Sequence, residues 1–162
     1  MLIGKSHYKQ PSITVDAIIP KLSSILLIKR KKDPYKDTLA LPGGFVEYSE
    51  TAEQAIIREV FEETSLKIHV LDILGIYSDP KRDPRGHVMT IVFISKIYGG
   101  KELQGDDAKE IHWVKLKELD TIKLAFDHSL IIKDYNIWKK IRGTYWTTKD
   151  RIDNPSTGPK QP

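Results

Sequence analysis

Three glutamates of this sequence, Glu59, Glu62 and Glu63, have the spacing of one face of a helix. At 100° per residue they fall within an arc of roughly 100°, and like charges three or four residues apart repel each other on a helix. A cation would relieve this repulsion, and carboxylate oxygens suit Mg²⁺ or Mn²⁺, which also bind water and substrate phosphates. The three side chains therefore predict a divalent metal site, with a solvated acidic face as the alternative.

The residues before these glutamates complete a longer pattern. Pro42-Gly43-Gly44 forms a turn whose glycines permit backbone conformations closed to other residues, and Glu50 and Arg58 follow it. The 23 residues 44–66 resemble the signature of the Nudix hydrolases and match it at every position but one. Ser65 stands where the family has glycine. This position ends the helix, where glycine takes a left-handed conformation most easily, so we expect the serine to affect stability rather than chemistry.

The resemblance implies an α+β fold, namely an α/β/α sandwich with a mixed sheet, a loop-helix-loop formed by the signature, and a C-terminal helix. It also implies metal-dependent hydrolysis of a nucleoside diphosphate linked to another group. By position in the signature, the metal ligands would be Glu62, Glu63 and the carbonyl of Gly43. Glu59 would be a further ligand or the base that activates water. When bound, the cation would neutralise the diphosphate and lower the pKa of water.

Two other signature residues have supporting roles by the same resemblance. Arg58 would orient the glutamates through charge-assisted hydrogen bonds, and Glu50 would hold the loop against the helix or Arg58. Members of the family differ in where the catalytic base lies. We therefore rank Glu59 first, Glu110 second and Asp107 third for that role.

Three segments outside the signature bear on the substrate: 77–87, 105–110 and 124–128 resemble the prokaryotic ADP-ribose pyrophosphatases. The resemblance predicts hydrolysis of ADP-ribose to AMP and ribose 5-phosphate. Other enzymatic alternatives are a nucleoside triphosphate, a diadenosine polyphosphate, NADH or a sugar nucleotide as substrate. A non-catalytic ADP-ribose sensor is a further alternative, although we expect a winged helix after such a domain and about 20 residues follow the last expected helix.

The segment 77–87 supplies most of the candidate substrate ligands. Arg82 and Arg85 could pair with phosphate, and Asp79 or Asp83 could accept hydrogen bonds from ribose hydroxyls. The equal alternative is that Asp-Pro pairs end strands and the charges are solvated. The remaining candidates are Arg30, from a basic run that also reads as a solvated strand end, and His87.

Histidines and aromatic residues complete the candidates. No spacing typical of imidazole metal ligands occurs, and His128 is expected to pack near the site at the start of a helix. Trp113, Tyr77 and Phe45 are candidates to stack on adenine, although burial in the core is the commoner fate of such residues.

Apolar periodicity and turn residues predict the elements that position these groups. Strands are expected at 13–19 and 25–28, as a hairpin, and then at 39–41, 68–77, 88–98 and 111–114. A helix is expected over 51–64, begun by a capping box of Thr51 and Gln54. Its apolar side, made of Ile56, Ile57, Val60 and Phe61, should pack on a sheet. A second helix, over 127–141, should end at Gly143.

Composition limits the class of protein. The 162 residues suit one domain over 1–142 and a polar, loosely ordered tail over 143–162. Cysteine is absent, which excludes disulfides and thiolate sites, and no stretch is long and apolar enough for a membrane span. The net charge of +4 lies in residues 139–162, which hold 6 basic and 2 acidic residues, against 20 and 20 before them. We therefore expect no nucleic-acid partner and a cytoplasmic enzyme; the resemblance implies a homodimer.

Overall fold

The computed structural model describes residues 9–102 and 110–149. In the described part of the chain, nine strands, two α-helices and one 3-10 helix follow one another. They are β1 (Ser12–Ile18), β2 (Pro20–Lys21), β3 (Ser24–Lys29), β4 (Leu39–Ala40), β5 (Gly43–Phe45), α1 (Ala52–Thr64), β6 (Leu66–Tyr77), β7 (Val88–Gly100), β8 (Ile111–Lys115), η1 (Leu116–Thr121), α2 (His128–Ile141) and β9 (Tyr145–Trp146).

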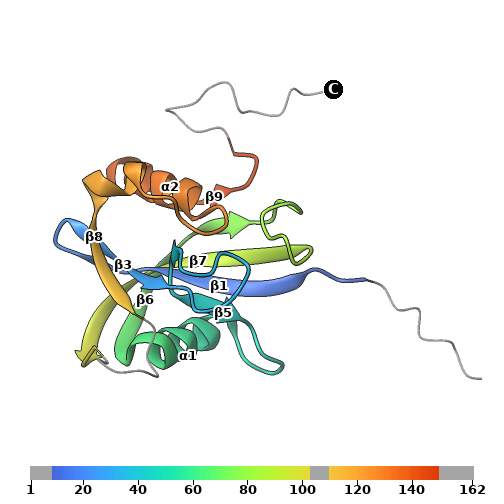
Figure 1. Ribbon diagram of the computed structural model, residues 1–162, viewed down its shortest axis with the longest axis horizontal. Coiled ribbons are helices and arrows are strands. Elements are labelled where there is room, and N and C mark those ends of the chain that lie inside the picture. The colour runs from blue at the N-terminus through green and yellow to red at the C-terminus, as the bar shows by residue number, and fades with distance from the viewer. Residues whose placement is uncertain (1–8, 103–109, 150–162) are drawn as a thin grey trace, which may run out of the picture.

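The strands form two sheets. The larger has the order β5-β1-β7-β6-β9, in which β1 runs parallel to β7 and β9 parallel to β6, while the other neighbours are antiparallel. In the smaller sheet β3 pairs with β2, β4 and β8, all antiparallel. Helix α1 covers one side of the sheets and α2 the other (Figure 1). This arrangement confirms the predicted α/β/α sandwich with a mixed sheet.

The helix carrying the glutamates buries a narrower face than the sequence predicted. Ile56 and Val60 are fully buried against the sheet, whereas Ile57 and Phe61 are 43% and 47% exposed. Ile57 and Phe61 each follow a buried residue directly, so their side chains are rotated 100° further around the helix axis. This rotation takes them beyond the stripe that the sheet covers. The buried residues of the helix also include Glu63 and Thr64, so the helix places a carboxylate among its buried side chains.

Both ends of α1 follow the local sequence signals. The Thr51 hydroxyl accepts a hydrogen bond from the Gln54 amide at 3.2 Å, and the Gln54 side chain accepts one from the Thr51 amide at 2.8 Å. The predicted capping box is therefore confirmed. At the other end Ser65 is left-handed, with φ 58° and ψ 14°, and its amide donates to the Phe61 carbonyl. The position where the family has glycine thus has the backbone that favours glycine.

The predicted hairpin of strands is correct only at its turn. Residues 20–21 pair with 24–25, but β1 lies beside β7 along its whole length and β3 beside β8. The first two strands consequently belong to different sheets. Burial of both faces of each strand explains this, because β1 and β3 each contain at least four consecutive buried residues, and such strands need covering on both faces.

The C-terminal segment corrects the expected tail. Tyr145 is buried, and β9 pairs with β6 at Gly75, where an added Cβ would lie 2.2 Å from the Tyr145 carbonyl oxygen. Glycine therefore permits the contact, and the tail prediction is wrong for residues 145–146. Helix α2 is capped by Arg142 rather than Gly143. Neither α-helix of the described chain combines the length and apolarity that crossing a membrane requires.

Candidate active site

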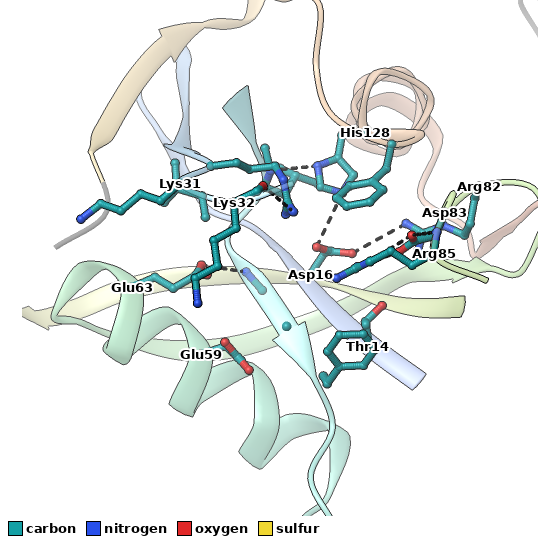
Figure 2. A pocket seen from close by; sticks show the side chains of 18 of the residues that line it. Thr14, Asp16, Lys31, Lys32, Glu59, Glu63, Arg82, Asp83, Arg85 and His128 are labelled. Atoms are coloured by element: carbon teal, nitrogen blue, oxygen red, sulfur yellow. Dashed lines mark hydrogen bonds and ion pairs between the residues drawn. The ribbon is translucent and has the colours of Figure 1, made fainter. Parts of the chain in front are cut away.

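A pocket of about 510 Å³ opens between α1, the start of α2 and the loop that joins β6 to β7. Glu59 and Glu63 project from α1 on one side of it, while Arg82, Asp83 and Arg85 lie on the other side (Figure 2). Asp16 of β1 lies between the two sides, near His128. The pocket therefore has an acidic wall on α1 and a wall of paired charges opposite.

The acidic wall depends on the turn that precedes it. The Gly43 amide donates a hydrogen bond of 3.0 Å to the buried Glu63 carboxylate. A Cβ on Gly44 would lie 2.2 Å from a carboxylate oxygen of Glu59. Glycine is required at position 44 because the backbone passes directly over this carboxylate. The turn thus holds two glutamates, one helical turn apart, at the pocket.

Arg58 connects the helix to the loop before it. Its guanidinium donates to Glu50 over 2.6 and 3.1 Å, to Glu59 over 2.9 Å and to the Phe45 carbonyl over 3.0 Å. The hydrogen bond from Arg58 lowers the pKa of Glu50, and the same bond raises the pKa of Arg58. Both groups are therefore charged at neutral pH, and Glu59 is oriented from outside the pocket.

Unlike Glu59 and Glu63, Glu62 lies outside the pocket. Its side chain is 58% exposed, lies 3.4 Å from Arg58 and does not line the pocket. Among residues 9–102 and 110–149, no three histidine or carboxylate side chains lie close enough together to hold a metal ion. The structure brings two of the three predicted glutamates to the pocket and leaves the third on the outer face of the helix.

The opposite wall consists of two arginine–carboxylate pairs. Arg82 binds Asp127 through two hydrogen bonds of 2.7 and 3.0 Å, and Arg85 binds Asp83 with its shortest contact at 2.7 Å. Burial opposes the charge of Arg82, but the hydrogen bonds to Asp127, together with the charges of Asp127 and the other nearby carboxylates, raise the pKa of the arginine overall. Burial likewise opposes the charge of Asp83, but Arg85 lowers its pKa overall. Arg82, Asp83 and Arg85 are therefore charged.

Asp16 and His128 form the floor of the pocket. Asp16 accepts a hydrogen bond of 2.7 Å from the Thr90 hydroxyl and lies 3.7 Å from Nε2 of His128. Nδ1 of His128 accepts a hydrogen bond of 2.9 Å from the Leu41 amide. A ring nitrogen that accepts is unprotonated, and burial lowers the pKa of this histidine. His128 is therefore neutral and joins α2 to the strand end before the glycine turn.

The family model described as "NUDIX domain" matches residues 10–135. The chain belongs to the Nudix family. It is 56% identical, over 82% of its length and 77% of the relative's, to a Methanocaldococcus jannaschii protein named ADP-ribose pyrophosphatase. The Nudix domain of Shewanella oneidensis NrtR, solved with ADP-ribose, has a TM-score of 0.71 at 26% identity, covering 82% of this chain and 91% of that one.

A third relative was solved with a nucleotide and a metal ion. It is a bifunctional NMN adenylyltransferase/ADP-ribose pyrophosphatase from Francisella tularensis, in complex with AMP and a Mn ion. The TM-score is 0.69 at 32% identity, and the match covers 86% of this chain and 44% of that one. This chain is therefore similar to less than half of the bifunctional protein.

Several residues predicted for the Nudix site lie outside the pocket. Asp79 instead accepts a hydrogen bond from the Lys81 amide within its own turn. His87 is exposed, and its backbone carbonyl accepts from Ser12. Glu110 lies 3.4 Å from Lys29 and 3.1 Å from His112. Asp107 lies outside the described residues.

Two of the three aromatic residues predicted to stack on adenine also lie outside the pocket. Tyr77 is buried in the core and donates to Asp134 at 2.7 Å, and Trp113 donates to Glu102 away from the pocket. Of the three predicted aromatics, only Phe45 lines the Nudix pocket, where it is joined by Phe126, which the sequence analysis passed over. The resemblance of 124–128 to the pyrophosphatases was the available signal. Thr14, Asp16, Lys31, Lys32, Asp33 and Glu47 also line the pocket without having been predicted.

Proposed function

We propose that this Nudix protein hydrolyses the diphosphate bond of ADP-ribose and releases AMP and ribose 5-phosphate. The observation that carries the proposal is one pocket with glutamates on one wall and arginines on the other. Such a pocket suits a substrate that is anionic at its centre and is cleaved there. The likeness to a named ADP-ribose pyrophosphatase supports the choice of substrate.

The residues fit the divalent cation that Nudix hydrolases generally require. Glu59 and Glu63 supply hard carboxylate oxygens one helical turn apart, beside the backbone of Gly43. We assign these three residues as the groups that would hold Mg²⁺ or Mn²⁺. The exposed side chain of Glu62 would join them by turning from the outer face of the helix toward the cation. A bound cation would neutralise phosphate charge and make water more acidic.

The chain's own residues perform the remaining tasks. Glu59 is our first candidate for the base, because Arg58 orients its carboxylate at the edge of the pocket. Glu50 holds Arg58 in place. Arg30 and Arg85 line the pocket and are our candidates to bind the substrate phosphates. The homodimer and the cytoplasmic location remain predictions.

A substrate panel tests the proposal. Purified protein is incubated with ADP-ribose, NADH, a diadenosine polyphosphate, a nucleoside triphosphate and a sugar nucleotide, each with Mg²⁺ or Mn²⁺, and products are separated by chromatography. We expect AMP from ADP-ribose at the highest kcat/KM. Turnover of another nucleotide with ADP-ribose left intact would refute the substrate, and binding of ADP-ribose without any turnover would identify a sensor.

Substitution of the glutamates tests the site. We expect Glu63→Gln to lower kcat by about 100-fold or more, because the carboxylate charge is lost while the shape is kept. Glu53→Gln is the matched control, since Glu53 lies in the first turn of the same helix and away from the pocket. Thermal unfolding is measured alongside. Full activity of folded Glu63→Gln would remove this residue from the site.

A further inference from the structure

The basic wall of the pocket is arranged around the ring of Phe126. The guanidinium carbon of Arg30 lies 4.8 Å from the ring centroid, that of Arg85 5.6 Å and that of Arg82 6.0 Å. These distances are within the range of attraction between a cation and an aromatic face. Arg30 follows β3, the other two arginines belong to the loop between β6 and β7, and Phe126 precedes α2. One side chain therefore contacts cations from two distant segments.

The backbone of Phe126 is held in an unfavourable conformation. Its φ is 52°, in the left-handed region that costs a bulky residue about 1–3 kcal/mol. Neighbouring contacts fix it there: the Ala125 amide donates to the Leu39 carbonyl at 2.9 Å, and Asp127 binds Arg82. Tyr35 packs edge-on to the ring at 4.9 Å. Strain that the surroundings enforce at a pocket is a sign of function rather than of packing alone.

Two of the three arginines remain available to a ligand. The guanidinium of Arg82 is 3% exposed and bound on one edge by Asp127. Arg85 uses Nε and Nη2 for Asp83, and Arg30 uses the same two nitrogens for the Pro34 and Lys32 carbonyls. Within residues 9–102 and 110–149, Nη1 of Arg30 and of Arg85 has no hydrogen-bond partner. The guanidiniums of Arg30 and Arg85 are therefore each held by hydrogen bonds at one edge and by the Phe126 ring at one face.

Arg30 and Arg85 carry like charges, so other groups must offset the repulsion between them. Burial and the nearby charge of Arg85 both lower the pKa of Arg30. The ring of Phe126 offers its negative face to both groups, and Asp83 offsets the charge of Arg85. An anion between the two guanidiniums would relieve the remaining repulsion. The cluster is therefore suited to phosphate oxygens.

We propose that Phe126 is a positioning residue that holds Arg30 and Arg85 as a clamp for the phosphate groups of the substrate. The proposal rests on the proposed function for the identity of the diphosphate. Phe126 acts through the two arginines in this arrangement and does not serve as the platform for the base. Its substitution should therefore weaken the binding of phosphate-bearing ligands and leave a nucleoside unaffected.

Calorimetric titration with AMP and with adenosine tests this distinction. We expect Phe126→Leu to weaken AMP binding about tenfold and adenosine binding less than twofold. Phe126→Tyr, which keeps the ring, should recover most of the AMP affinity. Phe61→Leu is the matched control, since Phe61 is an exposed phenylalanine outside the pocket. An equal loss for AMP and adenosine would show a base-stacking platform and overturn the proposal.

A double-mutant cycle tests whether Phe126 acts through the arginines. In an Arg30→Gln/Arg85→Gln background, Phe126→Leu should change AMP affinity less than twofold, because the groups it positions are gone. A full tenfold effect in that background would overturn the proposal. If Phe126→Leu does not fold, the arginine variants still test whether Arg30 and Arg85 form the clamp, and failure of that test overturns the proposal. They must lose AMP binding at least tenfold and keep adenosine binding.

The two proposals can fail separately. Suppose that the Phe126 effects appear with AMP but the wild-type protein leaves ADP-ribose intact: the clamp then stands and the proposed substrate is wrong. Suppose instead that ADP-ribose is hydrolysed and folded Phe126→Leu binds AMP like the wild type: the function then stands and the clamp is wrong.

Discussion

The two walls of the pocket hold their charges in different ways. On the α1 wall, Arg58 finds its partners between one and thirteen residues away, and its side chain is 24% exposed. On the opposite wall, Arg82 binds Asp127 across 45 residues of sequence, and its side chain is 3% exposed. The Arg58 ion pairs are local in sequence and partly exposed, whereas the Arg82–Asp127 pair is distant in sequence and largely buried.

This difference separates chemistry from folding. A charge network near solvent contributes little to stability but can be reoriented by a ligand or a cation. A buried pair that joins two loops is expensive to break, because the remaining partner is left unpaired. We infer that the α1 wall is adjusted for reaction and that the Arg82–Asp127 pair of the opposite wall fixes the shape of the pocket.

Removing one arginine from each wall gives the largest contrast. We expect Arg82→Ala to lower the free energy of unfolding by about 3–5 kcal/mol, since both Asp127 and the buried Asp16 would lose the cation near them. Arg58→Ala should cost about 1 kcal/mol or less. Its kcat should nevertheless fall, because Glu59 loses its orientation. Urea unfolding followed by tryptophan fluorescence measures both stabilities.

A double variant completes that experiment. Asp127→Ala in the Arg82→Ala background should restore part of the lost stability, because it removes the unpaired carboxylate. Equal stability losses for Arg58→Ala and Arg82→Ala would contradict the distinction between the walls. So would an Arg58→Ala protein with unchanged kcat.

The same distinction explains what could be predicted from sequence. The capping box, the left-handed Ser65 and the position of Glu50 beside Arg58 all involve residues within one short segment. Spacing predicts the capping box, and the resemblance to the family signature predicts the other two. The family resemblance extends this local pattern to the sandwich fold. The glutamates were placed on one face, but only the packed helix shows that Glu62 points away from the pocket.

The opposite wall could not be predicted in this way. The sequence marks Arg82, Asp83 and Arg85 as charged but does not say which carboxylate each arginine meets. That choice follows from the packing of α2 beside the loop between β6 and β7. Asp16 is a clearer omission, because a carboxylate in an apolar strand needs a buried partner, which here is Thr90. Strand β9 is two residues long and depends on Gly75 of β6. Two residues are too few to show the apolar periodicity from which a strand is predicted.

The neutral histidine on the pocket floor gives a pH test of intermediate size. Burial holds the pKa of His128 below the 6.5 of a solvated histidine. Above pH 6.5 the folded and unfolded states are both neutral at this residue. As the pH falls below 6.5 the unfolded chain takes up a proton that the folded protein resists, so stability decreases down to the folded pKa. The slope is at most about 1.4 kcal/mol per pH unit.

Substitution isolates this contribution. His128→Asn should be less stable than the wild type at about pH 7.5 but should lose less stability between about pH 7 and pH 5. His87→Asn, at an exposed position, should follow the wild-type slope. The measurement is urea unfolding at each pH. A wild-type slope in His128→Asn would mean that the acid sensitivity comes from other groups.

The smallest effect is expected at the end of α1. Substitution of Ser65 there should change the stability of the α1 wall without changing its catalytic activity. Ser65 has the left-handed backbone that costs a residue with a Cβ about 1 kcal/mol. Ser65→Gly should therefore raise the free energy of unfolding by up to about 1 kcal/mol, reduced by the greater freedom of glycine in the unfolded chain. Ser65→Ala keeps the strain and should bring no such gain. Because Ser65 does not line the pocket, kcat should stay within twofold in both variants. A severalfold change in kcat for Ser65→Gly would show that the end of this helix, although local in sequence, helps to place the glutamates.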